Sequence, residues 1–330
     1  MAEIIDTTLD RAGALARAVD VLGRGRPIAL PTETVYGLAA DATRAEAIAS
    51  IYEVKGRPRF NPLISHVSDM EMAARHGLFD PISRRLAEAF WPGPLTLVVA
   101  RAPDSAVHAL ATAGLETLGL RMPEGFARAV ISAFGKPLAA PSANTSGRIS
   151  PTTAAHVADD LGSAIDLILD AGPAGIGLES TIVKVENGQL RLLRPGGLAA
   201  ADIEAVAGQR LLRPETAGAA IQAVGAALEA PGMLASHYAP DAAVRLDATE
   251  VRPGEALIRF GGVALPGEEK AAIVLDLSPT GNLREAAAHL FSYMKQADAT
   301  GARTIAFSAI PDDGLGEAIR DRLERAAAPR

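Results

Sequence analysis

Residues 141–147 read Pro-Ser-Ala-Asn-Thr-Ser-Gly and follow a short apolar run at 138–140. This order predicts a buried strand that runs into a polar turn. Residues 31–37 (Pro-Thr-Glu-Thr-Val-Tyr-Gly) follow another apolar run, and residues 55–58 (Lys-Gly-Arg-Pro) follow a predicted helix. Ligands of open α/β sheets bind beyond the carboxyl ends of strands. Two fixed cations and several small hydrogen-bond donors at such places indicate a site for a polyanion.

The segments around these turns predict an α/β domain with a mixed sheet, because helices and apolar runs are intermixed. Asn187-Gly188 between two apolar runs is a strong hairpin signal. Helices are predicted at 9–23, 45–54, 83–90 and 125–134, and strands at 27–30, 63–67, 95–100, 118–121, 138–140, 167–170, 180–186 and 189–193.

The composition changes near Gly208. Residues 209–229 mix Pro, Gly and Ala with weak periodicity, and Pro-Gly and His-Tyr-Ala-Pro follow at 231–240. We predict a first domain at 1–207, a linker at 208–240 that folds back over the cleft, and a small α/β domain at 241–330. Strands at 256–260, 272–277 and 304–308, with helices at 282–299 and 314–327, predict a small open-sheet, Rossmann-like fold for the second domain.

The composition also limits the class of protein. The 330 residues are 48% hydrophobic and 22% charged, which supports a sizeable core. The net charge of −7 argues against a surface that binds nucleic acid all over. Cysteine is absent, which excludes disulfides and thiolate metal sites. Neither a secretion signal nor an 18-residue apolar stretch is found, so we expect a cytoplasmic protein without a membrane span.

Lys55 and Arg57 are the first candidates for chemistry. They lie two residues apart in a turn that is constrained by Pro58, and two such cations can converge on one phosphate chain. The alternative is a solvated surface pair. Asn61, Pro62 and the buried strand that follows favour the phosphate interpretation.

Ser142 and Asn144 offer a hydroxyl and an amide at the end of a predicted strand. Such groups bind phosphate oxygens, but they also form N-caps and Asx turns. Ser150 precedes Pro151 in the manner of an N-cap before a proline at the first helical position. Ser150 could therefore cap a helix, bind a ligand, or do both.

Four other polar residues lie at predicted strand ends. Thr34 belongs to a polar cluster that could equally be a simple turn. His66 could bind a ligand, although a lone histidine is more often structural. Arg121 could clamp a carboxylate with two hydrogen bonds or form a salt bridge, and Arg194 begins an Arg-Pro-Gly-Gly turn that resembles an anion-facing turn.

Several familiar catalytic patterns are absent from the sequence. The six histidines show no HExxH spacing, and neither a GxSxG elbow nor a Walker A motif occurs. No covalent nucleophile is evident. A reaction at these turns is therefore expected to depend on positioning and charge stabilisation.

Taken together and in this order, seven segments resemble the YrdC-type threonylcarbamoyl-AMP synthase family: residues 31–41, 55–66, 91–96, 119–123, 141–151, 179–182 and 193–196. Residues 231–240 resemble the linker of the long, two-domain members. The resemblance implies a YrdC-type mixed-sheet domain and an L-threonylcarbamoyladenylate synthase, which is a nucleotidyltransferase. This family makes threonylcarbamoyl-AMP from L-threonine, bicarbonate and ATP, releases pyrophosphate, and serves threonylcarbamoyladenosine formation next to the tRNA anticodon.

The resemblance also implies roles for single residues. Lys55 and Arg57 match the catalytic, ATP-binding KxR positions, and Ser142 and Asn144 match the SxN positions. Ser236 departs from the family pattern, because a basic residue is expected there, and this departure puts a linker contribution to phosphate charge in doubt. Further matches to nucleotide positions are Asn61, Ser150, Arg194, Thr117 and Tyr238, and matches to threonine positions are Thr34, His66, Arg121 and Ser180.

The resemblance further implies cofactors and partners. Mg²⁺ is expected with ATP, held by phosphate oxygens and water, since no carboxylate cage is visible and no metal site is predicted on the protein. A downstream threonylcarbamoyl transferase complex would receive the product, and tRNA would be an indirect partner only.

Two alternatives remain. An RNA-binding module of the tRNA modification pathway is disfavoured by the net charge of −7 and the 4% aromatic content. A carbamoyl-adenylate domain that acts on carbamoyl phosphate, as in hydrogenase maturation, is disfavoured because no acylphosphatase-like segment or zinc-finger cysteines are present.

Overall fold

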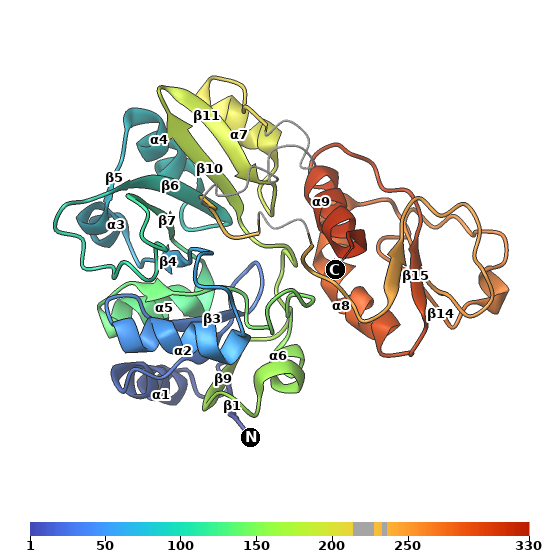
Figure 1. The fold of residues 1–330 in the computed structure, drawn as a ribbon, viewed down its shortest axis with the longest axis horizontal. Coiled ribbons are helices and arrows are strands. Elements are labelled where there is room, and N and C mark those ends of the chain that lie inside the picture. Colours follow the sequence, from blue (N-terminus) through green and yellow to red (C-terminus); the bar gives the residue numbers. More distant parts are fainter. Residues whose placement is uncertain (214–227, 233–235, 330) are drawn as a thin grey trace.

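The structure is a computed structural model that describes residues 1–213, 228–232 and 236–329. Figure 1 shows a larger part that contains the N-terminus and a smaller part beside it that contains α8 and α9. Much of the predicted linker, residues 214–227 and 233–235, lies outside the described residues. The domain boundaries at 207 and 240 therefore stay predictions.

A mixed sheet forms the centre of the larger part, as predicted. Its strands are β1 (Glu3–Asp6), β2 (Ile28–Leu30), β3 (Gly37–Asp41), β4 (Ile64–His66), β5 (Gly77–Leu78), β6 (Leu95–Arg101), β7 (Thr117–Arg121), β8 (Leu138–Ala139), β9 (Leu167–Asp170), β10 (Thr181–Glu186) and β11 (Gln189–Arg194). The order is β1-β9-β2-β3-β8-β4-β7-β6-β10-β11, and β5 pairs with β6. β4 runs parallel to β7, so the carboxyl ends of these two strands lie side by side. β8 runs antiparallel to β4.

Helices cover this sheet: α1 (Arg11–Gly23), α2 (Ala45–Lys55), α3 (Met70–His76), α4 (Pro81–Phe90), α5 (Gly125–Phe134), α6 (Ala154–Leu161) and α7 (Ala200–Ala207). Local sequence explains their ends. Gly56 ends α2 in the left-handed conformation (φ 59°), which is the usual role of glycine after a helix. The Asp80 side chain accepts hydrogen bonds from the first turn of α4, and Pro81 takes the first helical position.

The smaller part is a four-stranded parallel sheet, which confirms the predicted open-sheet, Rossmann-like fold. Its strands are β12 (Ala243–Arg245), β13 (Ala256–Arg259), β14 (Ile273–Asp276) and β15 (Thr304–Phe307), in the order β12-β15-β13-β14. The helices are α8 (Leu283–Asp298), α9 (Gly316–Ala327) and the 3₁₀ turn η1 (Glu268–Lys270). Asn282 caps α8 through its side chain.

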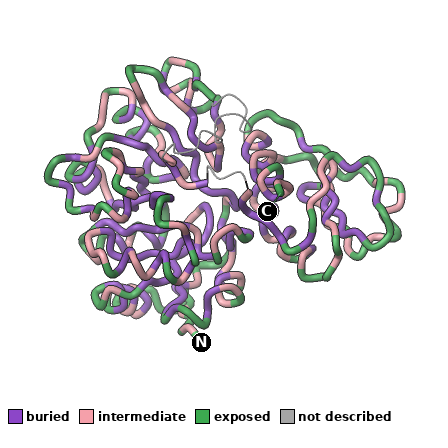
Figure 2. The backbone as a smooth tube through the Cα atoms, viewed as in Figure 1, coloured by how far each residue is buried: buried purple, intermediate pink, exposed green. Residues whose placement is uncertain are grey.

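The two parts share apolar packing. The core of the smaller part includes Val35, Ile149 and Leu178 from the larger part, and Tyr238 from the linker, packed with residues such as Phe291. Figure 2 shows buried backbone running through the junction between the two parts. None of the helices in the described part of the chain has the length and apolar character needed to cross a membrane.

Candidate active site

The polar turns predicted from the sequence lie side by side in the structure. The Ala143 N–H donates to the Tyr36 carbonyl at 2.8 Å, and the Ser146 N–H donates to the Lys55 carbonyl at 2.9 Å. These bonds bring together three segments that are distant in sequence.

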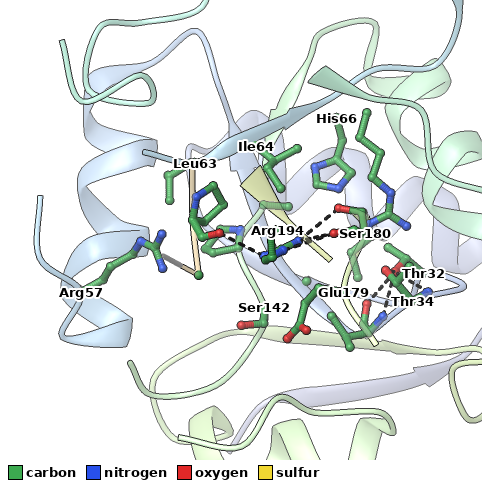
Figure 3. Close-up of a pocket in the computed structure, with 18 of the residues that line it drawn as sticks. Thr32, Thr34, Arg57, Leu63, Ile64, His66, Ser142, Glu179, Ser180 and Arg194 are labelled. Carbon is green, nitrogen blue, oxygen red and sulfur yellow. Dashed lines mark hydrogen bonds between the residues drawn. The ribbon is translucent and has the colours of Figure 1, made fainter. Parts of the chain in front are cut away.

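The turns form one wall of a pocket with an empty volume of about 700 Å³, part of it open to solvent. Strand ends of β4, β7 and β11 and the segment before β10 form the rest of the wall (Figure 3). The described residues Pro231, Gly232, His237 and Tyr238 of the predicted linker also line it. Eight of the predicted site residues are among the lining residues: Thr34, Arg57, His66, Arg121, Ser142, Ser180, Arg194 and Tyr238.

Arg57 and Arg194 are buried cations in the pocket wall. Arg57 is 8% exposed and donates to the Pro62 carbonyl at 3.1 Å. Arg194 is 4% exposed and donates to the Ser180 carbonyl at 2.8 Å. Neither guanidinium forms an ion pair with a carboxylate of the described residues. Burial is the main cause that lowers the pKa of Arg57 to about 10 and also lowers the pKa of Arg194, so an anion in the pocket would stabilise both charges.

Lys55 does not line the pocket. It is 2% exposed, and its Nζ donates to the Ser142 carbonyl at 2.6 Å and to the Asn144 carbonyl. Burial, and secondarily Arg57, hold the Lys55 pKa well below its usual range. In this arrangement Lys55 fixes the turn that carries Ser142 and Asn144.

Four other predicted nucleotide residues lie outside the pocket lining. Asn61 and Asn144 are buried, and their Oδ1 atoms have no hydrogen-bond partner among the described residues. Ser150 donates to Glu179 Oε1 at 2.5 Å. Thr117 begins β7, four positions and about 13 Å of strand before Arg121. Their contact with ATP stays a prediction.

The four predicted threonine residues, Thr34, His66, Arg121 and Ser180, all line the pocket. Thr34 is fully buried, and its hydroxyl lies 2.9 Å from that of Thr32. The Ser180 hydroxyl lies 2.7 Å from Thr96 Oγ1. Arg121 forms a 2.5 Å ion pair with Glu33, so a carboxylate ligand would have to share or displace this contact.

His66 faces the pocket as a neutral side chain. Burial, with Arg121 as the next contribution, lowers the pKa of His66 to about 3, and its Nδ1 atom has no hydrogen-bond partner among the described residues. His237 is in a similar state, since burial lowers its pKa to about 3. Both histidines are therefore neutral at pH 7 and available as uncharged hydrogen-bonding groups.

These pKa values predict how stability depends on pH. The unfolded chain protonates histidine near pH 6.5, but the folded chain protonates His66 only near pH 3. The contribution of neutral His66 to the free energy of unfolding is thus complete above about pH 6.5 and is lost as the pH falls toward 3.

We expect the melting temperature to fall between about pH 7 and about pH 5, and to fall less in His66→Gln. Thermal melts over this range measure the effect, with His108→Gln as the control for loss of an imidazole outside the pocket; equal slopes in wild type and His66→Gln would contradict it.

Sequence reasoning missed two buried charged residues at the site. Glu179 lines the pocket, and its Oε2 accepts a hydrogen bond of 2.9 Å from Arg322 Nε in α9. Burial alone would raise the Glu179 pKa, but Arg322, Arg194 and Ser150 outweigh burial and lower it. Glu179 is therefore an anion at pH 7. Position 179 lies within a family-like segment, but nothing in the sequence identified Arg322, 143 positions away, as its partner.

The residues of the site do not form a cage for Mg²⁺. Within the described residues, no group of three or more His, Cys, Asp or Glu side chains could hold a metal ion. The pocket carboxylate of Glu179 already accepts hydrogen bonds from Ser150 and Arg322. Mg²⁺ bound by ATP phosphates and water stays an expectation.

The described linker residues Gly232 and Tyr238 pack tightly at the pocket. Tyr238 is 1% exposed, has a left-handed backbone (φ 61°), and stacks on Phe291 with 5.6 Å between ring centroids. This backbone conformation costs about 1–2 kcal/mol in a residue with a side chain. Gly232 also has a positive φ of 84°, and a Cβ there would lie 2.8 Å from Arg194 Cδ, so glycine permits the close approach.

Comparison with known proteins shows which family this chain resembles over its length. A family profile described as "Telomere recombination" (Sua5/YciO/YrdC) matches residues 20–196, and one described as "Threonylcarbamoyl-AMP synthase, C-terminal domain" matches residues 198–328. The chain is 39% identical to the threonylcarbamoyl-AMP synthase of Bacillus subtilis (96% of this chain and 93% of the relative). It is 38% identical to that of Pyrococcus abyssi (95% of this chain and 94% of the relative).

A solved structure extends the likeness to three dimensions. The crystal structure of P. abyssi Sua5 in complex with L-threonine aligns with a TM-score of 0.84 and 35% identity, over 95% of this chain and 94% of that one. These matches confirm the predicted class of enzyme. The chain therefore belongs to the Sua5/YrdC family of threonylcarbamoyl-AMP synthases, in its long, two-domain form.

Proposed function

We propose that this enzyme forms L-threonylcarbamoyl-AMP from L-threonine, bicarbonate and ATP, with release of pyrophosphate and water. The observation that carries the proposal is the pair of buried guanidiniums, Arg57 and Arg194, which have no carboxylate partner among the described residues and face the pocket. A polyphosphate supplies the missing negative charge. The P. abyssi relative in complex with L-threonine supports threonine as the second ligand.

The chemistry needs no enzyme nucleophile. The threonine amine attacks bicarbonate or the carbon dioxide derived from it, and water is lost as the carbamate forms. A carbamate oxygen then attacks the α-phosphorus of ATP, and the bond to the leaving pyrophosphate breaks. The substrate thus supplies its own nucleophile, and the protein contributes positioning and charge stabilisation.

Each group of residues has a proposed part in this reaction. Arg57 and Arg194 offset charge that develops on the phosphates, and Lys55 holds the turn of Ser142 and Asn144 in place. Arg121 binds the threonine carboxylate. Neutral His66 can offer threonine an uncharged hydrogen-bonding group beside Arg121.

We further propose the cellular setting that the family implies. The product would pass to a threonylcarbamoyl transferase complex for modification of tRNA next to the anticodon, in the cytoplasm. The enzyme itself would meet tRNA only indirectly.

A thermal-shift experiment tests substrate binding. ATP and threonine are each expected to raise the melting temperature, because a ligand at about 100 times its Kd stabilises the folded state by about 2.7 kcal/mol. Serine lacks one methyl group and should give a smaller shift, since a methyl is worth about 1–3 kcal/mol. No shift with ATP, together with salt-dependent retention of RNA, would instead favour the RNA-binding alternative.

A further inference from the structure

One buried arginine of the second domain contacts residues that line the pocket. Arg322 in α9 is 0% exposed, although it carries a full charge. Its Nε donates to Glu179 Oε2 at 2.9 Å, and its Nη2 donates to the Pro195 carbonyl at 2.9 Å. Its guanidinium also lies 5.0 Å from the centroid of the Tyr238 ring. One side chain thus contacts three segments, of which Glu179 and Tyr238 line the pocket, and Figure 1 shows α9 at the junction of the two parts.

The surrounding packing leaves little room for these segments to move. A Cβ at Gly196 would lie 2.3 Å from the Glu179 carbonyl oxygen, and a Cβ at Gly177 would lie 2.4 Å from the Ala287 carbonyl oxygen in α8. Backbone therefore approaches backbone closely on both sides of Glu179. The close approach of Gly177 to α8 is thus a backbone contact between the two parts, two residues before Glu179.

Glu179 and Arg194 have opposite charges and line the same pocket (Figure 3). Even so, they do not form an ion pair: Glu179 bonds to Ser150 and Arg322, while Arg194 donates to the Ser180 and Pro231 carbonyls. A buried carboxylate that lost its cation would be costly and would turn to another positive charge. Arg194 lies nearby, and its charge already helps to lower the Glu179 pKa.

We propose that Arg322 is a positioning residue. By pairing with Glu179 it prevents an ion pair between Glu179 and Arg194, so that the charge of Arg194 remains available to the phosphates of ATP. The second domain would then complete the nucleotide site through this contact. This inference rests on the proposed use of ATP, and it gives the second domain a specific part in substrate binding.

Suppression by a second substitution tests the inference. In Arg322→Gln, Glu179 pairs with Arg194, so ATP affinity should fall about tenfold, as expected for loss of one charge-assisted contact. Threonine affinity should change much less. In the double variant Arg322→Gln/Glu179→Gln the competing carboxylate is gone, so most of the ATP affinity should return. Calorimetric titration of the full chain with a non-hydrolysable ATP analogue, and separately with threonine, gives these values.

Arg320→Gln is the matched control. Arg320 lies on the same helix, and its ion pairs are with Asp247, Asp312 and Glu324 of the second domain. The Arg320→Gln protein should bind the analogue as the wild type does. An Arg322→Gln protein that is folded by circular dichroism and binds the analogue normally would overturn the inference, and so would a double variant as weak as the single one.

Should Arg322→Gln fail to fold, Arg322→Lys decides the question, because it weakens the hold on Glu179 without leaving a buried carboxylate unpaired. Analogue binding should be measurably weaker than in wild type while threonine binding is unchanged, and wild-type affinity for the analogue would refute the inference. The proposed function fails separately: if the variants show these binding changes but the wild-type chain forms no threonylcarbamoyl-AMP, only the reaction is overturned.

Discussion

Arg57→Ala is expected to lower ATP-dependent pyrophosphate release by about 100- to 1,000-fold, because it removes a fixed cation from a water-poor phosphate site. Arg57 is 8% exposed and has no ion-pair partner among the described residues, so its loss strands no buried carboxylate there. The fold should therefore persist while the reaction fails. Pyrophosphate release with threonine and bicarbonate present measures the effect, and circular dichroism checks the fold.

Arg59→Ala provides a matched control for Arg57→Ala. Arg59 lies two residues away in the same loop, and it is exposed and absent from the pocket lining. Its replacement should change the rate by less than about twofold, as surface substitutions usually have small effects. Similar rates for Arg57→Ala and wild type would show that this turn does not bind the phosphates of ATP.

Arg121→Ala is expected to weaken threonine binding by about 100-fold or more, since loss of one partner of a buried charge pair costs about 2–5 kcal/mol. ATP binding should change far less. Calorimetric titration with each ligand separately gives the two affinities. Equal losses for both ligands would contradict a role as the threonine clamp.

Glu33→Gln separates the clamp from a purely structural salt bridge. Glu33 holds Arg121 at 2.5 Å in the structure. If Arg121 serves only to hold Glu33, this variant should harm threonine binding as much as Arg121→Ala does. If Arg121 binds the threonine carboxylate, the neutral amide of Glu33→Gln competes less for the guanidinium, and threonine should bind at least as tightly as in wild type.

Long or strongly marked elements were predictable from the sequence. The helix at 9–23 and the hairpin around Asn187-Gly188 appear where the patterns place them, because periodicity and turn chemistry are local properties. The predicted strand at 138–140 is β8 and leads into the turn of Ser142 and Asn144.

Elements that no clear local pattern marks were missed. β3 reads Gly-Leu-Ala-Ala-Asp, and Gly, Ala and Asp disfavour strands; pairing with β2 and β8 makes it one. α6 and α7 have eight residues each, too few for a clear period. The contact of Glu179 with Arg322 depends on how the second domain docks, which no local pattern encodes.

The sequence also could not assign a task to each cation of the KxR turn. Lys55 and Arg57 are two residues apart, and both were predicted to meet phosphate. In the structure, Lys55 donates to two backbone carbonyls, whereas Arg57 lines the pocket. Which way each side chain points depends on the fold around Gly56 and on the turn that Lys55 contacts.

Direct detection of the product tests the central claim. The full-length protein is incubated with ATP, threonine and ¹⁴C-bicarbonate, and the mixture is separated by chromatography with mass detection. We expect label in threonylcarbamoyl-AMP and one pyrophosphate for each molecule formed, and no labelled adenylate when ATP or threonine is omitted. Pyrophosphate release without label in an adenylate, or no ATP turnover by a folded protein, would contradict the account.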